Sequence, residues 1–419
     1  MDKRRTFVNV ETLYLILCAA SIVIEISVIG RLMLADLLFG AALPFLIAKR
    51  GASMIGGRAK SFLLFASLWL LGAVATDTIR STPFEDIARG WSRLIFFAVN
   101  FTSIWLLVDG KWQRIVVFIY CLFIAVAIRR YFSIDQLDID NAVFGSGWKF
   151  GYGQLLTATS FILSALLMYY PMTRLAGISL PFAASAVDLA LNARNLFGIT
   201  GLSAAVVAFA SSRRRRRLSP IFLTVATMVG LATGWGLLSA YGYAAASGML
   251  GVDAKDKYDL QSSGSLGILL GGRADSLAST QAIIDSPIIG HGSWARDISY
   301  VELMVSRLEA AGYEVEGDPL SSDLIPSHSH LLGAWVEAGI LGAVFWLWAS
   351  WIAICGLYNA ITRVTVFTGF ITFVGISLLW DILFSPFALE RRVITAAWLI
   401  LMILTIESAP SGTPQTRGS

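Results

Sequence analysis

Charged side chains are scarce in this sequence. Asp, Glu, Lys and Arg together make up 14% of its 419 residues, whereas 56% are apolar. Because a soluble globular domain carries roughly 25% charged residues, this shortage excludes an ordinary water-soluble protein. At about 20 residues per membrane-spanning helix, the length predicts a single polytopic bundle in place of two or three soluble domains.

Cysteine is nearly absent as well. The three cysteines, Cys18, Cys121 and Cys355, all lie within apolar runs, and this pattern excludes a disulfide framework. We interpret them as small buried side chains. Histidine is equally rare, with three residues, but all three are concentrated in one part of the chain.

Long apolar runs are what the sequence has in abundance. They predict an all-α polytopic integral membrane protein with about twelve transmembrane helices. The predicted helices cover residues 12–29, 32–48, 61–76, 91–108, 115–130, 153–170, 175–191, 195–211, 218–240, 331–357, 364–384 and 393–407.

The distribution of basic residues predicts the orientation of these helices. When the helices alternate across the membrane, the most basic short loops, such as 49–60 and the run Arg213–Arg217, fall on one side. Positive charge is retained in the cytoplasm, so both termini are predicted to be cytoplasmic. The arginine run is then a topology signal in contact with lipid headgroups, and not a nucleic-acid site.

The same orientation divides the chain into four parts. Residues 1–240 form an N-terminal transmembrane bundle of about nine helices. Residues 241–327 form one large outward-facing loop, and a connection of this length is usually functional or has structure of its own. Residues 328–408 form about three C-terminal transmembrane helices. Residues 409–419 have the composition of a disordered cytoplasmic tail.

The outward-facing loop and its exit contain all three histidines, His291, His328 and His330. Two helices are predicted within the loop, from Arg273 to Ile284, where Pro287 follows, and from about Ser299 to Ala311. Because histidine changes its charge near neutral pH, this concentration makes the loop the candidate functional region.

Several arginines lie on the outward side, where topology does not explain them. They are Arg129, Arg130, Arg194, Arg273, Arg391 and Arg392. Arg194 lies in a tight turn, Leu-Asn-Ala-Arg-Asn-Leu, between two apolar runs, and a charge at such a depth indicates a functional site. Arginine binds phosphate oxygens through two parallel hydrogen bonds, so a phosphate-bearing ligand is predicted. The alternative is contact with lipid headgroups.

Pro326 and Ser327 predict a helix start, which places His328 and His330 in the first turn, where free amides favour an anion. Three interpretations of the histidines stay open at this point. They are capping or otherwise satisfied polar groups, a three-histidine metal site that includes His291, or a general base beside an arginine-bound phosphate. A His-x-His pair in a helical turn splays its rings, and no acidic residue is spaced to complete a metal site.

The residues after 270 resemble the bacterial O-antigen ligase and O-antigen polymerase superfamily. The hallmark of that family is Gly-Arg at the opening of a helix, then Pro-x-x-Gly-x-Gly, then a His-Asn pair, and finally Glu-x-Gly-x-x-Gly. Matching segments occur here in the same order and spacing, as Gly272-Arg273, Pro287 to Gly290-His-Gly292, and His328 to Glu337-Ala-Gly339-Ile-Leu-Gly342. His328, not His330, holds the register of the family's catalytic histidine.

The match has departures. Arg194 corresponds to the arginine of a Ser-Arg-Gly-like motif, although Ala193 and Asn195 differ from the usual wording. Ser329 replaces the usual Asn after the histidine, and Leu277 stands where the family often has Trp. Neither Ser329 nor Leu277 removes a functional group that the chemistry needs.

The resemblance implies a glycosyltransferase that moves a glycan from an undecaprenyl-diphosphate donor to an acceptor sugar hydroxyl, such as that of lipid A–core. It implies a periplasmic active site on a protein of the bacterial inner membrane, with no cofactor, no metal and no nucleic acid. Arg194 and Arg273 are expected to bind the diphosphate, and His328 is expected to be the general base. His330, Glu337 and His291 are secondary candidates.

Two other functions remain as alternatives. A polymerase of the same superfamily would use another lipid-linked repeat unit of an O-antigen or exopolysaccharide as the acceptor. A transporter or flippase would use intramembrane carboxylates, for which Glu25, Asp36, Asp188 and Asp381 are candidates, together with two related halves of the chain. We find no internal repeat, and a transporter does not require every histidine on one outer loop.

Overall fold

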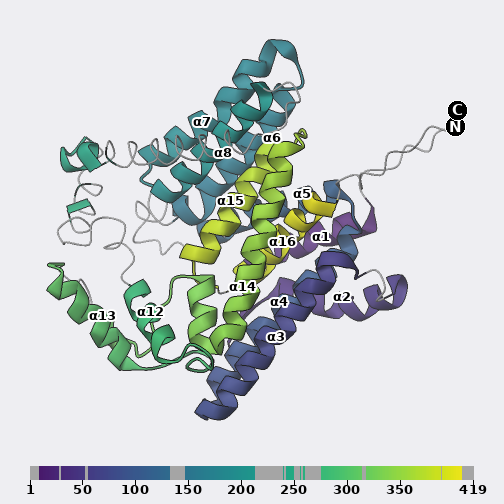
Figure 1. Cartoon of the computed structure of the whole chain (residues 1–419). Coiled ribbons are helices and arrows are strands. Elements are labelled where there is room, and N and C mark those ends of the chain that lie inside the picture. Colours follow the sequence, from purple (N-terminus) through teal and green to yellow (C-terminus); the bar gives the residue numbers. More distant parts are fainter. Residues whose placement is uncertain are drawn as a thin grey trace, which may run out of the picture.

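The protein is a bundle of α-helices with one small β-hairpin and a helical appendage at one end (Figure 1). The computed structural model describes residues 9–27, 30–51, 55–132, 147–212, 239, 242–249, 255, 258–259, 275–313, 318–387 and 389–407. The all-α prediction is therefore confirmed for the described residues, apart from the hairpin.

Most predicted helices are present, and many extend beyond the predicted bounds because their ends carry charged residues. The bundle helices are α1 (Val10–Ala20), α2 (Leu34–Arg50), α3 (Gly57–Arg80), α4 (Phe84–Val108), α5 (Trp112–Phe132), α6 (Gly153–Leu167), α7 (Arg174–Ala190), α8 (Arg194–Ser212), α14 (His330–Thr362), α15 (Thr368–Phe384) and α16 (Arg391–Glu407). Short 3-10 turns cover Ser21–Val23, Pro171–Thr173 and Pro319–Ser321, and a π turn covers Trp148–Tyr152.

The first predicted helix, 12–29, is too long. Helix α1 ends at Ala20, and the chain then forms strands β1 (Glu25–Ser27) and β2 (Arg31–Met33), which pair antiparallel. The segment is rich in Val and Ile, which are β-branched and suit a strand better than a helix. The apolar run alone did not distinguish the two structures.

Helix α16 forms the centre of the bundle. Its residues from Val393 to Ile406 are all buried, and a helix that is apolar on every face belongs inside a packed core. It packs against α3, α4, α5, α14 and α15. Both cavities described below lie at the end of the bundle where α16 begins.

Five of the described helices are long and apolar enough to cross a membrane, namely α3, α4, α5, the stretch Trp148–Leu167 and α14. Shorter apolar helices cover Val10–Val23, Arg194–Phe209 and Thr368–Phe384. These helices indicate a membrane protein. The count of twelve spans, the cytoplasmic termini and the four-part division stay predictions, and the predicted span 218–240 lies outside the described residues.

Ion pairs group the ends of α1, α2 and α5 at two opposite ends of the bundle. Glu11 in α1 lies near Arg50, at the end of α2, and near Arg114, at the start of α5. At the opposite end of the bundle, Glu25 after α1 pairs with Arg129, at the end of α5. Helices α1 and α5 therefore run in one direction and α2 runs in the opposite direction.

The predicted outward-facing loop contains two helices with a hydrophobic core of their own. They are α12 (Asp275–Asp285) and α13 (Ile298–Ala310), close to the predicted bounds. Ala282 of α12 and Val301 of α13 pack with Val336 of α14 in this core. Figure 1 shows α12 and α13 beside one end of α14 and the neighbouring end of α3.

Candidate functional site

The two glycine-containing motifs of the sequence lie against each other. Residues 288–292 cross α14 at Gly339, where the helical backbone is interrupted. Backbone hydrogen bonds join the two segments, from His291 N–H to Val336 O (2.7 Å), from Gly292 N–H to Glu337 O (3.1 Å) and from Ile340 N–H to Ile288 O (3.3 Å). The interruption of α14 leaves backbone N–H and C=O groups without partners inside the helix, and the crossing segment supplies hydrogen bonds to them.

Glycine is required at this crossing. Gly339 has φ +62°, and a Cβ atom there would lie 1.9 Å from the carbonyl oxygen of Ile288. Gly290 has φ +82°, and its Cβ would lie 2.6 Å from the backbone nitrogen of Gly339. A side chain at either position would therefore meet both backbone strain and a steric clash with backbone atoms. The motif glycines allow two backbones to touch.

Helix α3 holds the same loop from the other side. Asp77 accepts hydrogen bonds from the backbone N–H and the Oγ of Ser293, each 2.7 Å long, and from Trp91 Nε1 at 2.7 Å. Arg80 Nε donates to Gly290 O at 3.0 Å. Arg296, which follows the loop, pairs with Asp86 of α4 at 3.0 Å. The loop is thus fixed between α3, α4 and α14.

A cavity of about 500 Å³ lies beside this loop. Its apolar walls come from α3, α13, α14 and the segments that follow α13 and α15, and include Trp69, Met304, Ile325 and Phe387. Its polar lining includes Arg93, Asp275, Ser327, His330 and Glu337. An apolar cavity with a few convergent polar groups is the usual form of a ligand site.

Arg93 and Glu337 form an ion pair in the wall of the cavity, and both side chains are largely buried, with 15% and 17% exposed. His330 is buried, and its Nδ1 is hydrogen-bonded to the carbonyl oxygen of Ser385. The Nε2 atom of His330 and the Nε atom of Arg93 are enclosed without a hydrogen-bond partner among the described residues.

His328 lies at the rim and not in the wall. Its side chain is 67% exposed, and its Nδ1 pairs with Asp275, a residue that does line the cavity. The predicted helix start is wrong by a few residues, because α14 begins at His330 with Ser329 as its N-cap, whose Oγ accepts from Leu332 N–H at 3.1 Å. Ser and Asn are about equally good N-caps, so Ser329 can replace Asn here.

His291 holds the loop to α12. Its Nε2 is hydrogen-bonded to the carbonyl oxygen of Ala282 at 2.8 Å, and its ring packs edge-on against Tyr300. A structural role therefore accounts for its contacts. In the parts of the chain that the structure describes, no group of three His, Cys, Asp or Glu residues could hold a metal ion.

Arg194 lies at the same end of the bundle but not in the same cavity. It is the first residue of α8, after a turn in which Asn192 has φ +60°. Its neighbour Asn195 lines a second cavity of about 20 Å³, together with Lys149 and Arg391. Ser385 lines this small cavity, whereas Pro386 and Phe387 line the large one, so a single short segment borders both cavities. Arg273 lies outside the described residues.

The other arginines that were predicted to face outward have carboxylate partners, which account for their burial without a phosphate ligand. Their pairs are Arg129 with Glu25 and Glu390, Arg130 with Glu390, Arg391 with Asp381, and Arg392 with Asp36. Asp188 accepts from Trp148 Nε1 at 3.0 Å and from two threonines. All four candidate intramembrane carboxylates therefore have polar partners within the bundle.

Three residues at the cavity were not singled out in the sequence. Arg93 lies at the outer end of the predicted helix 91–108, so the topological rule that drew attention to Arg129 also applies to it. Asp275 follows Arg273 by two positions, which is a weak signal. Trp294 has no sequence signal, because its importance comes from a backbone conformation.

No model of a known protein family matches the chain, and no curated protein matches it.

Proposed function

We propose that the chain is an O-antigen ligase-like glycosyltransferase of the bacterial inner membrane. It transfers a glycan from a polyprenyl diphosphate, undecaprenyl diphosphate in bacteria, to an acceptor sugar hydroxyl such as that of lipid A–core. The reaction takes place at the periplasmic face, among membrane lipids. One observation carries the proposal: the Pro-x-x-Gly-x-Gly and Glu-x-Gly-x-x-Gly segments, far apart in sequence, form one site with His328, His330 and a large cavity.

The length of α14 supports a site at the membrane surface. Its residues from Ile340 to Thr362 alone span about 34 Å at 1.5 Å per residue, which exceeds the roughly 30 Å hydrocarbon core of a bilayer. The first turns, with His330 and Glu337, can therefore lie beyond the hydrocarbon. A lipid-linked donor brings its diphosphate to that level, because the lipid chain stays in the membrane.

His328 acts as the general base. A proton on Nδ1 donates to Asp275, and Nε2 is then the ring nitrogen that accepts a proton from the acceptor hydroxyl. Asp275 is a positioning residue that fixes this tautomer, as carboxylates beside histidines commonly do. Such a base contributes roughly 10²–10⁴-fold in rate.

The bonds and charges balance in a single displacement. The acceptor oxygen attacks the anomeric carbon, its proton passes to Nε2 of His328, and the bond from that carbon to the diphosphate breaks. The diphosphate leaves with the electron pair, and its charge is neutralised by Arg194 and Arg273, because fixed positive groups stabilise charge that develops in the transition state. Attack from the opposite face inverts the anomeric centre.

A polymerase is the second candidate. It would use the same residues and the same donor, and its acceptor would be another lipid-linked repeat unit. The cavity of about 500 Å³ beside the base leaves room for an acceptor sugar. The two reactions differ only in the acceptor, so product analysis separates them.

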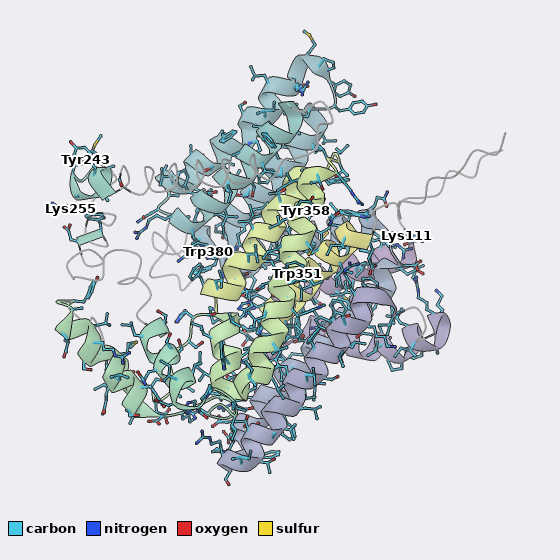
Figure 2. All side chains as sticks on the ribbon, in the orientation of Figure 1. Lys111, Tyr243, Lys255, Trp351, Tyr358 and Trp380 are labelled. Atoms are coloured by element: carbon cyan, nitrogen blue, oxygen red, sulfur yellow. The ribbon has the colours of Figure 1, made fainter. Side chains whose placement is uncertain are left out.

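The test is the lipopolysaccharide and exopolysaccharide profile of a deletion strain that carries wild type, His328→Ala or a control. We expect His328→Ala to behave as the deletion does. Trp351→Ala is the control, because Trp351 lies on α14 away from the cavity and is 63% exposed (Figure 2). Comparable amounts of each variant in the membrane fraction exclude an effect of expression.

The products identify the reaction. Lipid A–core without glycan, together with accumulated lipid-linked polymer, identifies a ligase. Chains that stop at one repeat unit, or the loss of an exopolysaccharide, identify a polymerase. If the deletion leaves both profiles unchanged, the proposed function is wrong. If His328→Ala is as active as wild type, His328 is not the base.

A further inference from the structure

Trp294 has a strained backbone. Its φ is +56°, and a bulky residue in the left-handed region is an outlier that persists only where its surroundings impose it. The neighbours supply that constraint, since Ser293 is bonded twice to Asp77 and Arg296 is paired with Asp86. Strain of this kind is concentrated at binding and active sites. The strained residue lines the large cavity.

The indole of Trp294 lies next to the ion pair in the cavity wall. The guanidinium carbon of Arg93 is 5.7 Å from the centre of the Trp294 ring, within the range of a cation–π contact. Arg93 in turn pairs with Glu337. A flat apolar face, a guanidinium and a carboxylate are therefore held together by three separate elements, the loop, α4 and α14.

Two polar atoms of residues in the cavity lining are enclosed. These are Nε2 of His330 and Nε of Arg93, and neither has a hydrogen-bond partner among the described residues. A buried polar group without a partner is destabilising. Both residues line the cavity, so hydroxyl groups of a bound molecule would supply the missing partners.

We propose that Trp294, Arg93, Glu337 and His330 form a binding subsite for one neutral sugar ring. The apolar face of the ring stacks on Trp294, and its hydroxyl groups bond to Glu337, Arg93 and His330. This inference deepens the proposed function by assigning the residues that recognise a sugar, and it rests on that function for the source of the sugar.

The charges of the cavity select a neutral ring. The positive charge of Arg93 is balanced by Glu337, and Asp275 adds a further carboxylate to the lining. A uronic acid would bring another negative charge beside these carboxylates and be disfavoured by like-charge repulsion. A lipid chain fits less well than a sugar, because it would cover the buried ion pair without supplying hydrogen bonds.

The test is saturation-transfer NMR on the full-length protein in lipid nanodiscs. The probes are methyl β-D-glucopyranoside, methyl β-D-galactopyranoside and the methyl glycoside of glucuronic acid. Glycoside detergents must be removed completely, because a maltoside headgroup would occupy the same subsite. Trp294→Gly removes the indole and relieves the positive φ, Glu337→Gln removes the carboxylate at nearly constant shape, and Trp351→Ala is the matched control.

We expect saturation transfer to the ring protons of a neutral glycoside with wild type and with Trp351→Ala. Trp294→Gly should weaken binding by roughly tenfold, the order expected when a buried aromatic contact is lost. Glu337→Gln should weaken it as well, and this variant decides the matter if Trp294→Gly does not fold. Binding that survives in both folded variants, no binding to wild type, or a preference for the uronic acid would overturn the proposal.

The outcomes separate this inference from the proposed function. If the glycoside binds as expected but the deletion strain keeps normal polysaccharides, the subsite stands and the transfer reaction does not. If the transfer reaction is confirmed but Trp294→Gly binds the glycoside and supports transfer as wild type does, the subsite is wrong and the reaction stands.

Discussion

The two ends of the bundle both carry clusters of arginine, but they use them differently. At one end, Glu11 lies within 3.5 Å of Lys49, Arg50 and Arg114, and Arg50 also pairs with Asp109 at 2.7 Å. We call this the Glu11 end. Figure 2 shows Lys111 in the same region, and it pairs with Asp109.

At the opposite end, which we call the cavity end, arginines also pair with carboxylates, but the pairing is incomplete. Arg392 pairs with Asp36 and also donates to two backbone carbonyls, whereas Arg93 pairs with Glu337 and keeps an enclosed nitrogen without a partner among the described residues. Unpaired polar atoms beside a cavity therefore distinguish the cavity end. The position of an arginine in the sequence does not show whether it is fully paired or lies at the cavity with an unpaired nitrogen. The partners in the structure do show this difference.

The largest effect is expected from Gly339→Ala, which attacks the loop crossing at the cavity end. The added Cβ would lie 1.9 Å from the Ile288 carbonyl oxygen at a positive φ. Strain and steric overlap together should lower the free energy of unfolding by roughly 2–6 kcal/mol. Thermal unfolding in nanodiscs measures this. Gly198→Ala is the control, since nothing lies within 4 Å of its Cβ, and equal stability of the two variants would disprove the locked crossing.

The next effect should come from Asp36→Ala, which breaks a buried pair. Asp36 and Arg392 are 0% and 4% exposed and 2.7 Å apart, and Asp36 also accepts from Asn100. Removal of one partner leaves a buried charge and should destabilise by about 3–5 kcal/mol. Lys49→Ala at the Glu11 end is the comparison, because Lys49 is 69% exposed and exposed pairs contribute about 1 kcal/mol or less. Similar losses in the two variants would contradict the contrast between the ends.

The fold could be predicted from the sequence where apolar runs are long. The runs 91–108 and 393–407 correspond to α4 and α16, because a buried helix must be apolar for its full length. The helix ends were less predictable. Polar residues such as Asp77 and Asp86 extend α3 and α4 beyond their apolar parts, and the contacts that bury them come from the loop at 290–296.

The segments that form the site could be predicted from the sequence, but the contacts between them could not. The order and spacing of Gly290, His328, Glu337 and Gly339 identified the segments that meet. Their contacts depend on tertiary packing, which decides that His330 faces the cavity and His328 its rim. Nothing in the sequence marks Trp294, because a positive φ in a tryptophan is imposed by neighbours.

A smaller effect should follow from Ser293→Ala, which weakens the attachment of the loop to α3. The Oγ of Ser293 donates to Asp77 at 2.7 Å, while its backbone N–H keeps a second bond to the same carboxylate. Loss of the hydroxyl should lower the free energy of unfolding by roughly 0.5–1.5 kcal/mol, or somewhat more for a charged acceptor. Hydrogen exchange of residues 290–296 should rise. Unchanged exchange would show that the backbone bonds alone hold the loop.

The smallest effect concerns Asp285, which joins α12 to α13 at the cavity end. Hydrogen bonds from Gln281 (3.0 Å) and Tyr300 (2.9 Å) lower the pKa of Asp285. A group whose pKa is lower in the folded state stabilises that state at pH values above its unfolded pKa of about 3.9. This stabilisation is lost as the pH falls through the pKa of the folded state. Exchange protection of α13 should therefore decrease between about pH 5 and about pH 3 in wild type, less in Gln281→Ala, and least in Asp285→Asn. The same decrease in Asp285→Asn as in wild type would assign the pH dependence to another group.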